Sequence, residues 1–269
     1  MNRDSVTVAA IQALPKGYFM NHENVDHAVY LLTEASRRGA DMACFPEAYP
    51  SLGEEEIREA ARNLGIFVIA GFLIKDGPRL YNESILIDSE GRVAERHRKS
   101  VAAPGVEPYS CGKEEFRPVE TPWGKIGILI CIEGWGFPEG FHSLSGEGVD
   151  LIFNPNLIFR KKHQMRMSLI SRVLDYKIPI VAPNNAFWSL RLFEQDPPAP
   201  PEGGQSLILA PPPFQTKQEI IQFTKDAPSC EGWIVAEGGK GEEILMATLD
   251  LKAMRRSRSL FNDCFFGRV

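Results

Sequence analysis

The chain has 269 residues, and its 30 lysines and arginines against 35 aspartates and glutamates give a formal net charge of −5. This weakly acidic balance lacks the basic footprint of a protein that binds nucleic acid or an anionic membrane. With 43% hydrophobic residues, a chain of this length can bury a large core, so the composition excludes a disordered protein. The length is compatible with a single α/β domain over residues 1–269.

The five cysteines are an odd number, lie far apart and include no CxxC pair, which argues against a disulfide framework and a structural zinc site. The five histidines form no metal-binding motif, so we expect neither a metal nor another cofactor. The apolar runs are far shorter than the roughly 20 residues that cross a bilayer, and the N-terminus lacks the apolar region of a signal peptide. These features predict a cytoplasmic protein.

The first half of the chain alternates between strand-like and helix-like patterns. Alternation and short apolar runs predict strands at residues 5–12, 42–45, 67–72, 83–87 and 92–98. Apolar side chains that recur on one helical face predict helices at residues 21–40 and 54–64. The last two strands form a hairpin, because Gly91 suits the positive φ of a tight turn.

The second half of the chain shows the same alternation of strand-like and helix-like patterns. Strands are predicted at residues 125–130, 151–153, 178–182, 205–209, 232–237 and 243–250, and helices from about Pro138 and at 161–176. Prolines cannot donate ladder hydrogen bonds, so the proline-rich stretch around 190–204 is a surface loop. From about residue 252 the chain continues as a basic, aromatic C-terminal tail.

Three ionisable side chains come directly after predicted strands. They are Glu47 in Phe45-Pro46-Glu47, Lys99 in Arg98-Lys99, and Cys131 in Leu129-Ile130-Cys131. In α/β sheets the carboxyl ends of strands form the crevice where ligands bind. Taken singly, each residue has an ordinary structural explanation: a loop charge, a solvated strand end and a small buried thiol.

Together the three residues form a chemical set. An ammonium near a thiol lowers the thiol pKa, and a carboxylate within reach can take its proton, which makes the sulfur a nucleophile. The ammonium also stabilises the oxyanion that forms when a thiolate adds to a carbonyl. The backbone N–H of Ile132, directly after Cys131, would be the second oxyanion donor. Carboxylate, ammonium and thiol thus suffice for acyl transfer.

These segments resemble the three motifs of the nitrilase, or carbon–nitrogen hydrolase, superfamily. The matching residues are Phe45-Pro46-Glu47, Arg98-Lys99, and Gly127-Ile128-Leu129-Ile130-Cys131 followed by Phe137-Pro138-Glu139. Their order and spacing agree with the family, and the resemblance extends from Val6 to about Arg258. It implies a four-layer α-β-β-α sandwich, an amidase-like activity and pairing of subunits into a homodimer or a higher homo-oligomer.

The resemblance also implies a second glutamate between the lysine and the cysteine, which orients the lysine and the substrate. Glu107, eight residues after Lys99, is our candidate. The same segment contains three rival carboxylates, Glu114, Glu115 and Glu120.

Two features depart from the family pattern. Glu133 stands two residues after Cys131, where many amidases of the family have aspartate and true nitrilases have glutamate. The spacing from Cys131 to Phe137 is also one residue longer than usual. Tyr49, Ile132 and Trp135, which lie near these motifs in the sequence, are the candidate substrate-binding residues.

The expected activity is therefore hydrolysis of a non-peptide C–N bond in a small-molecule amide, by a cysteine-dependent mechanism. A small or ω-amide is the first choice of substrate, a carbamoyl compound the second and a nitrile the third. The alternative of a different class is a catalytically silent binding or assembly module with the same fold.

Overall fold

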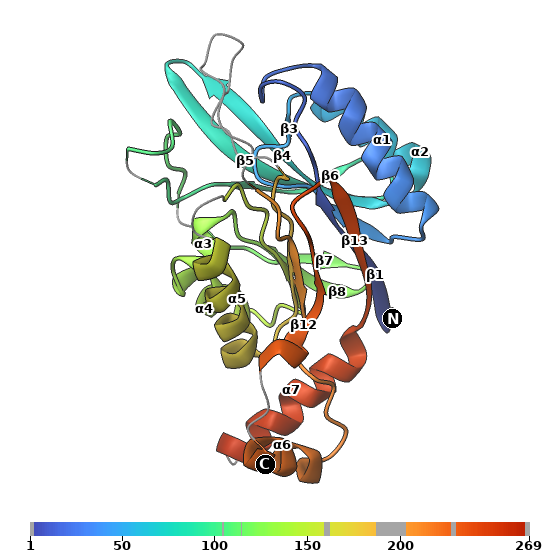
Figure 1. Ribbon diagram of the computed structural model, residues 1–269, viewed down its shortest axis with the longest axis vertical. Coiled ribbons are helices and arrows are strands. Elements are labelled where there is room, and N and C mark those ends of the chain that lie inside the picture. The colour runs from blue at the N-terminus through green and yellow to red at the C-terminus, as the bar shows by residue number, and fades with distance from the viewer. Residues whose placement is uncertain are drawn as a thin grey trace.

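Two β-sheets lie against each other between helices (Figure 1). Helices α1 (Glu23–Arg37) and α2 (Glu54–Leu64) lie on one side, and α3 (Ile132–Trp135), α4 (Glu139–Gly146) and α5 (Lys162–Tyr176) lie on the other. This is the α-β-β-α order that the family resemblance implied. The computed structural model describes residues 3–103, 105–113, 115–158, 162–186, 203–226 and 230–266.

The first sheet has the strand order β13-β1-β2-β4-β5-β6, and the short strand β3 pairs with β4. Strands β1, β2 and β4 are parallel, whereas β5 runs antiparallel to both β4 and β6. Consequently β2, β4 and β6 run the same way, and their carboxyl ends share one edge of the sheet. The strands are β1 (Ser5–Gln12), β2 (Met42–Cys44), β3 (Pro50–Ser51), β4 (Phe67–Asp76), β5 (Arg79–Ile87), β6 (Val93–Arg98) and β13 (Glu243–Asp250).

The second sheet has the order β12-β11-β10-β9-β8-β7, and its central strands β8, β9 and β10 are parallel. These three strands are buried along nearly their whole length, as expected for parallel strands covered on both faces. The strands are β7 (Val119–Thr121), β8 (Gly124–Ile128), β9 (Leu151–Phe153), β10 (Ile180–Ala182), β11 (Leu207–Leu209) and β12 (Ile234–Glu237).

The period-2 pattern of β1 separates two parts of the hydrophobic core. Val8 and Ala10 belong to the large cluster shared with the second sheet, whereas Ala9 and Ile11 belong to the cluster shared with α1 and α2. Each face of the first sheet is therefore covered, one by helices and one by the other sheet. This packing fixes the strand ends that carry the candidate site.

Several predicted elements match the structure to the residue: strands β1, β9 and β13 and helix α2. Three helices were not predicted: the short α3, α6 (Lys217–Asp226) and α7 (Leu251–Phe266). A short 3₁₀ helix spans Cys230–Trp233. The predicted C-terminal tail is thus helical, and α7 buries Leu251 and Met254 one turn apart. Most of the proline-rich loop lies outside the described residues.

No helix in the described part of the chain is both long enough and apolar enough to pass through a bilayer.

Asp150 connects α7 to the second sheet. Its Oδ2 accepts the backbone N–H of Lys125 at 3.1 Å and lies 3.3 Å from the guanidinium of Arg255. Its Oδ1 lies 3.4 Å from Arg258. The Asp150 side chain is only 9% exposed, so these contacts form away from bulk water.

Replacing Asp150 with asparagine keeps the shape but removes the charge that faces two arginines. We expect Asp150→Asn to lower the free energy of unfolding by about 1–3 kcal/mol, measured by urea denaturation. Asp4→Asn is the control, because Asp4 pairs with Lys252 in an exposed bridge worth about 0–1 kcal/mol. Equal unfolding free energies for Asp150→Asn and the wild type would contradict this role.

Candidate active site

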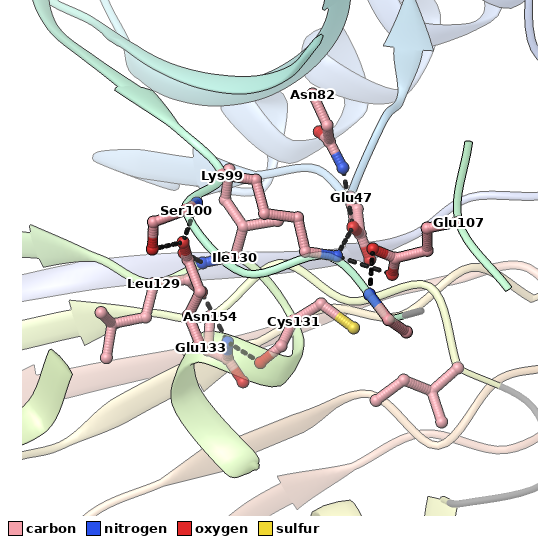
Figure 2. Close-up of polar contacts among 12 residues, drawn as sticks. Glu47, Asn82, Lys99, Ser100, Glu107, Leu129, Ile130, Cys131, Glu133 and Asn154 are labelled. Carbon is pink, nitrogen blue, oxygen red and sulfur yellow. Dashed lines mark hydrogen bonds and ion pairs between the residues drawn. The ribbon is translucent and has the colours of Figure 1, made fainter. Parts of the chain in front are cut away.

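The three predicted residues meet where strands of both sheets end (Figure 2). Glu47 follows β2 and Lys99 follows β6, at the edge that the parallel strands of the first sheet share. Cys131 follows β8 of the second sheet. A carboxylate oxygen of Glu47, one of Glu107 and the sulfur of Cys131 all lie within 4.8 Å of one another.

The ammonium of Lys99 lies between two carboxylates. Its Nζ donates to Oε1 of Glu47 at 2.6 Å and to Oε1 of Glu107 at 2.7 Å. The side chains of Lys99 and Glu47 are each 1% exposed, so both charges are withdrawn from water. Asn82 of β5 donates to the same oxygen of Glu47 at 2.7 Å. The other oxygen, Oε2, is buried and accepts no hydrogen bond from the described residues.

Glu107 is the glutamate that the fold brings to Lys99. Its Oε2 also accepts the backbone N–H of Ala103 at 3.1 Å, which orients the carboxylate. Glu115 instead pairs with Arg117 at 2.9 Å, and Glu120 is exposed on β7. The third rival, Glu114, lies outside the described residues.

Cys131 stands on a tight turn between β8 and α3, with φ at 52°. Its N–H donates to the carbonyl of Pro155 at 2.8 Å. The side-chain amide of Asn154 donates to the carbonyls of Leu129 and Cys131, at 2.5 and 3.1 Å. Gly134 permits this packing, because a Cβ there would lie 2.6 Å from the Asn154 side chain.

Burial controls the electrostatics of the cluster. It raises the pKa of Glu47, and the neighbouring carboxylate of Glu107 adds to this, although Lys99 opposes it. Burial by itself would lower the pKa of Lys99, but the charges of Glu47 and Glu107 raise it well above its usual value. The lysine is therefore a stable cation, whereas the glutamate binds a proton more readily than an exposed glutamate does.

The resting thiol differs from the sequence-based expectation. Burial and the carboxylate of Glu47 raise the pKa of Cys131, and together they outweigh the lowering by Lys99. The sulfur is therefore protonated at rest, and it would have to lose its proton to act as a nucleophile. A backbone N–H from Leu157 points to the sulfur and favours the thiolate.

Ile132 is the first residue of α3, so its N–H has no intrahelical acceptor. It donates to no acceptor among the described residues. This N–H is therefore free to donate to a ligand, and its role as an oxyanion donor stays a prediction.

Tyr49 does not reach this site, which corrects its prediction as a substrate-binding residue. Its ring packs in the cluster beneath α1 and α2, and its hydroxyl contacts His27 of α1 at 2.8 Å. Sequence proximity to Glu47 was misleading, because both residues lie in the turn between β2 and β3, where Ala48 has a φ of 54° and the backbone changes direction.

Trp135 is buried in the large core cluster, and its carbonyl accepts a hydrogen bond from Ser168 of α5. This placement packs Trp135 between α3 and α5, and its buried indole N–H makes no hydrogen bond to the described residues. Its role in substrate binding stays a prediction.

Tyr109 is a residue near the site that the sequence did not reveal. Its buried hydroxyl has no hydrogen-bond partner in the described part of the chain. Burial raises its pKa, and the charges of Glu47, Lys99, Glu107 and Cys131 all act on it. It packs in a small apolar cluster with Phe19, Ala48, Leu73 and Leu157. A phenol left without a partner there is suited to bind a polar group of a substrate.

Among the described residues, Glu47, Glu107 and Cys131 each offer one atom that could coordinate a metal ion. However, the ammonium of Lys99 already lies within 2.7 Å of both carboxylates. The position that a cation would take is therefore filled by a side chain of the protein itself, which does not favour a metal at this site.

A sequence model of the carbon–nitrogen hydrolase family matches residues 7–259, which is nearly the whole chain. The chain belongs to this family.

Relatives extend over most of the chain at low identity. A nitrilase from Pyrococcus abyssi is 25% identical, over 98% of this chain and 97% of its own length. An omega-amidase, NIT2, from Xenopus tropicalis is 23% identical, over 88% and 86% of the two chains. The crystal structure of a carbon–nitrogen hydrolase from Helicobacter pylori shares the fold at a TM-score of 0.80 and 16% identity, covering 99% and 95% of the two chains.

Lys99 neutralises the carboxylates of Glu47 and Glu107, with which no other cation of the described residues pairs. We expect Lys99→Met to destabilise the protein by about 3–5 kcal/mol near pH 8, because it leaves buried charge unpaired. The pKa of Glu47 should rise further in the folded variant, above its unfolded value. The penalty should therefore shrink as the pH falls through that raised pKa, because the protonated carboxyl needs no counter-charge.

Urea unfolding at pH 8 and pH 5 measures this difference. A loss of stability that is the same at both pH values would contradict the assigned role of the ammonium.

Proposed function

We propose that the protein is a cysteine-dependent amidase that hydrolyses a small or ω-amide to a carboxylate and ammonia through a thioester on Cys131. The observation that carries this proposal is the ammonium of Lys99 shared by Glu47 and Glu107 beside the sulfur of Cys131. The family membership supports C–N hydrolysis in general. Among the relatives, the omega-amidase supports an amide and the nitrilase keeps a nitrile as an alternative substrate.

In the first half-reaction, Glu47 takes the thiol proton as the sulfur of Cys131 attacks the amide carbonyl carbon. Oε2 of Glu47 is suited to this, because no N–H group of the described residues donates to it. The negative charge moves to the carbonyl oxygen, which the ammonium of Lys99 and the N–H of Ile132 stabilise. An ammonium has three donors, and the two carboxylates occupy only two of them.

The tetrahedral intermediate then collapses to the thioester. The C–N bond breaks, and protonated Glu47 gives its proton to the departing nitrogen, which leaves as ammonia. Glu47, again a carboxylate, next takes a proton from water, whose oxygen attacks the thioester. Collapse of the second intermediate releases the carboxylic acid and returns the proton to the sulfur. Glu107 orients Lys99 throughout and does not itself exchange a proton in this scheme.

The substrate must fit a site with one unpartnered phenol and mostly apolar neighbours. Tyr109 can hydrogen-bond a single polar group, while Phe19, Leu73 and Leu157 offer apolar contact. A panel of short aliphatic amides, ω-amides, carbamoyl compounds and nitriles, assayed for ammonia, ranks the substrate classes. No ammonia from any of them would favour a silent binding module.

Cys131→Ala should abolish ammonia release from the best amide of the panel, because no thioester can form. The circular dichroism spectrum and the thermal unfolding midpoint should stay near those of the wild type, because alanine is smaller than cysteine and fits in the space that the thiol occupies. Cys111→Ala is the matched control, because Cys111 is an exposed free thiol and should retain full activity. Wild-type turnover by Cys131→Ala would refute the mechanism.

The acid limb of kcat/KM should report Glu47. Its carboxylate must be ionised to accept the thiol proton, and its pKa is raised by burial. Activity should therefore fall with decreasing pH at a midpoint above the value of about 4.3 that is typical of glutamate. Glu47→Gln should remove this limb and reduce kcat by about 10²–10⁴-fold.

A pH–rate profile of both proteins from pH 4 to 9 measures these effects. A limb at the ordinary glutamate pKa, or one that persists in Glu47→Gln, would show that another group is the base.

A further inference from the structure

Glu133 is a second buried carboxylate, which the proposed reaction does not use. It lies two residues after Cys131 on α3 and is 1% exposed. Its Oε1 accepts both the N–H and the hydroxyl of Ser100, at 2.6 and 2.7 Å. Its Oε2 accepts the N–H of Ile130 at 2.7 Å and contacts Nε2 of His97 at 2.7 Å.

These partners flank the catalytic residues on both sheets. His97 and Ser100 lie on either side of Lys99, at the end of β6 in the first sheet, and Ile130 directly precedes Cys131 in the second. Figure 2 shows the carboxylate of Glu133 next to Ser100 and Ile130, on the opposite side of Lys99 from Glu47. One side chain therefore joins the backbone segments that carry the ammonium and the sulfur.

The chemistry of the contacts requires a carboxylate. Ser100 and Ile130 can only donate through their N–H groups, and His97 must donate from Nε2 to a charged oxygen. An amide at position 133 would turn its NH₂ group toward at least one of these donors. Although burial by itself would raise the pKa of Glu133, the charge of His97 and the hydrogen bonds from His97 and Ser100 lower it. The group is thus an anion in the folded protein.

We propose that Glu133, with His97 and Ser100, is a positioning residue that fixes the separation between the Lys99 ammonium and the Cys131 sulfur without touching the substrate. Four short hydrogen bonds to one rigid carboxylate restrict the two segments in direction as well as distance, which apolar packing would not do. This inference rests on the proposed function, because the separation matters only if both groups act on one carbonyl.

The test compares Glu133→Gln with Asp150→Asn. Both changes convert a buried carboxylate into its amide, but Asp150 connects α7 to the N-terminal ends of β8 and β9, away from the site. We expect both variants to lose stability. Only Glu133→Gln should lose kcat, on the order of 100-fold for a displacement of about 1 Å, with KM little changed.

A second measurement needs no known substrate. Iodoacetamide alkylates Cys131 at a rate that depends on proton transfer to Glu47 beside Lys99, and mass spectrometry of the Cys131 peptide follows it. Glu133→Gln should slow this alkylation by at least tenfold, whereas the rate at exposed Cys111 should not change. If the wild type hydrolyses no amide, the proposed function fails, yet the alkylation rates still decide whether Glu133 positions the two groups.

Ser100→Ala removes one of the four donors and keeps the backbone N–H, so it tests the inference even if Glu133→Gln does not fold. A smaller loss of kcat and of the Cys131 alkylation rate is expected. The inference fails if folded Glu133→Gln keeps the wild-type kcat and alkylation rate, because the network would then only stabilise the fold. If Glu133→Gln does not fold, the same result for Ser100→Ala decides against the inference.

Discussion

The site depends on one buried ammonium shared by two carboxylates. Glu47 and Glu107 could not both stay ionised so close together and so little exposed without the charge of Lys99 between them. In turn, the two negative neighbours keep the lysine protonated despite its burial. The cluster therefore consists of a fixed cation for the oxyanion, a carboxylate with a raised pKa and a thiol that is neutral until it attacks.

The sandwich explains why this arrangement is rigid. Glu47 and Lys99 come from two strands of one sheet that run the same way, and Cys131 comes from the other sheet. Their relative position thus depends on how the two sheets pack against each other. The hydrophobic core that the sheets share determines the approximate distance between them. The hydrogen bonds of Glu133 and of Asn154 set the position finely, because both side chains bind the backbone next to Cys131.

Sequence reasoning found the residues whose signal is local. Glu47, Lys99 and Cys131 each follow a recognisable strand. The four-layer sandwich and Glu107 were instead predicted from the resemblance to the carbon–nitrogen hydrolases, because no local pattern separates Glu107 from the other glutamates of its segment. Contacts between distant segments could not: Asn82 and Tyr109 carry no motif, and no pattern shows which face Tyr49 uses. Helix α7 was missed because its basic and aromatic composition was interpreted as a tail, although its apolar residues recur with a helical period.

Direct detection of the acyl-enzyme tests the central claim most sharply. The wild type would be mixed with the best small amide, quenched in acid within its first turnovers, digested and analysed by mass spectrometry. The account predicts that the peptide containing Cys131 gains the mass of the acyl group and loses it on treatment with hydroxylamine. Rapid ammonia release with no adduct on Cys131, or with the acyl group on another residue, would contradict it.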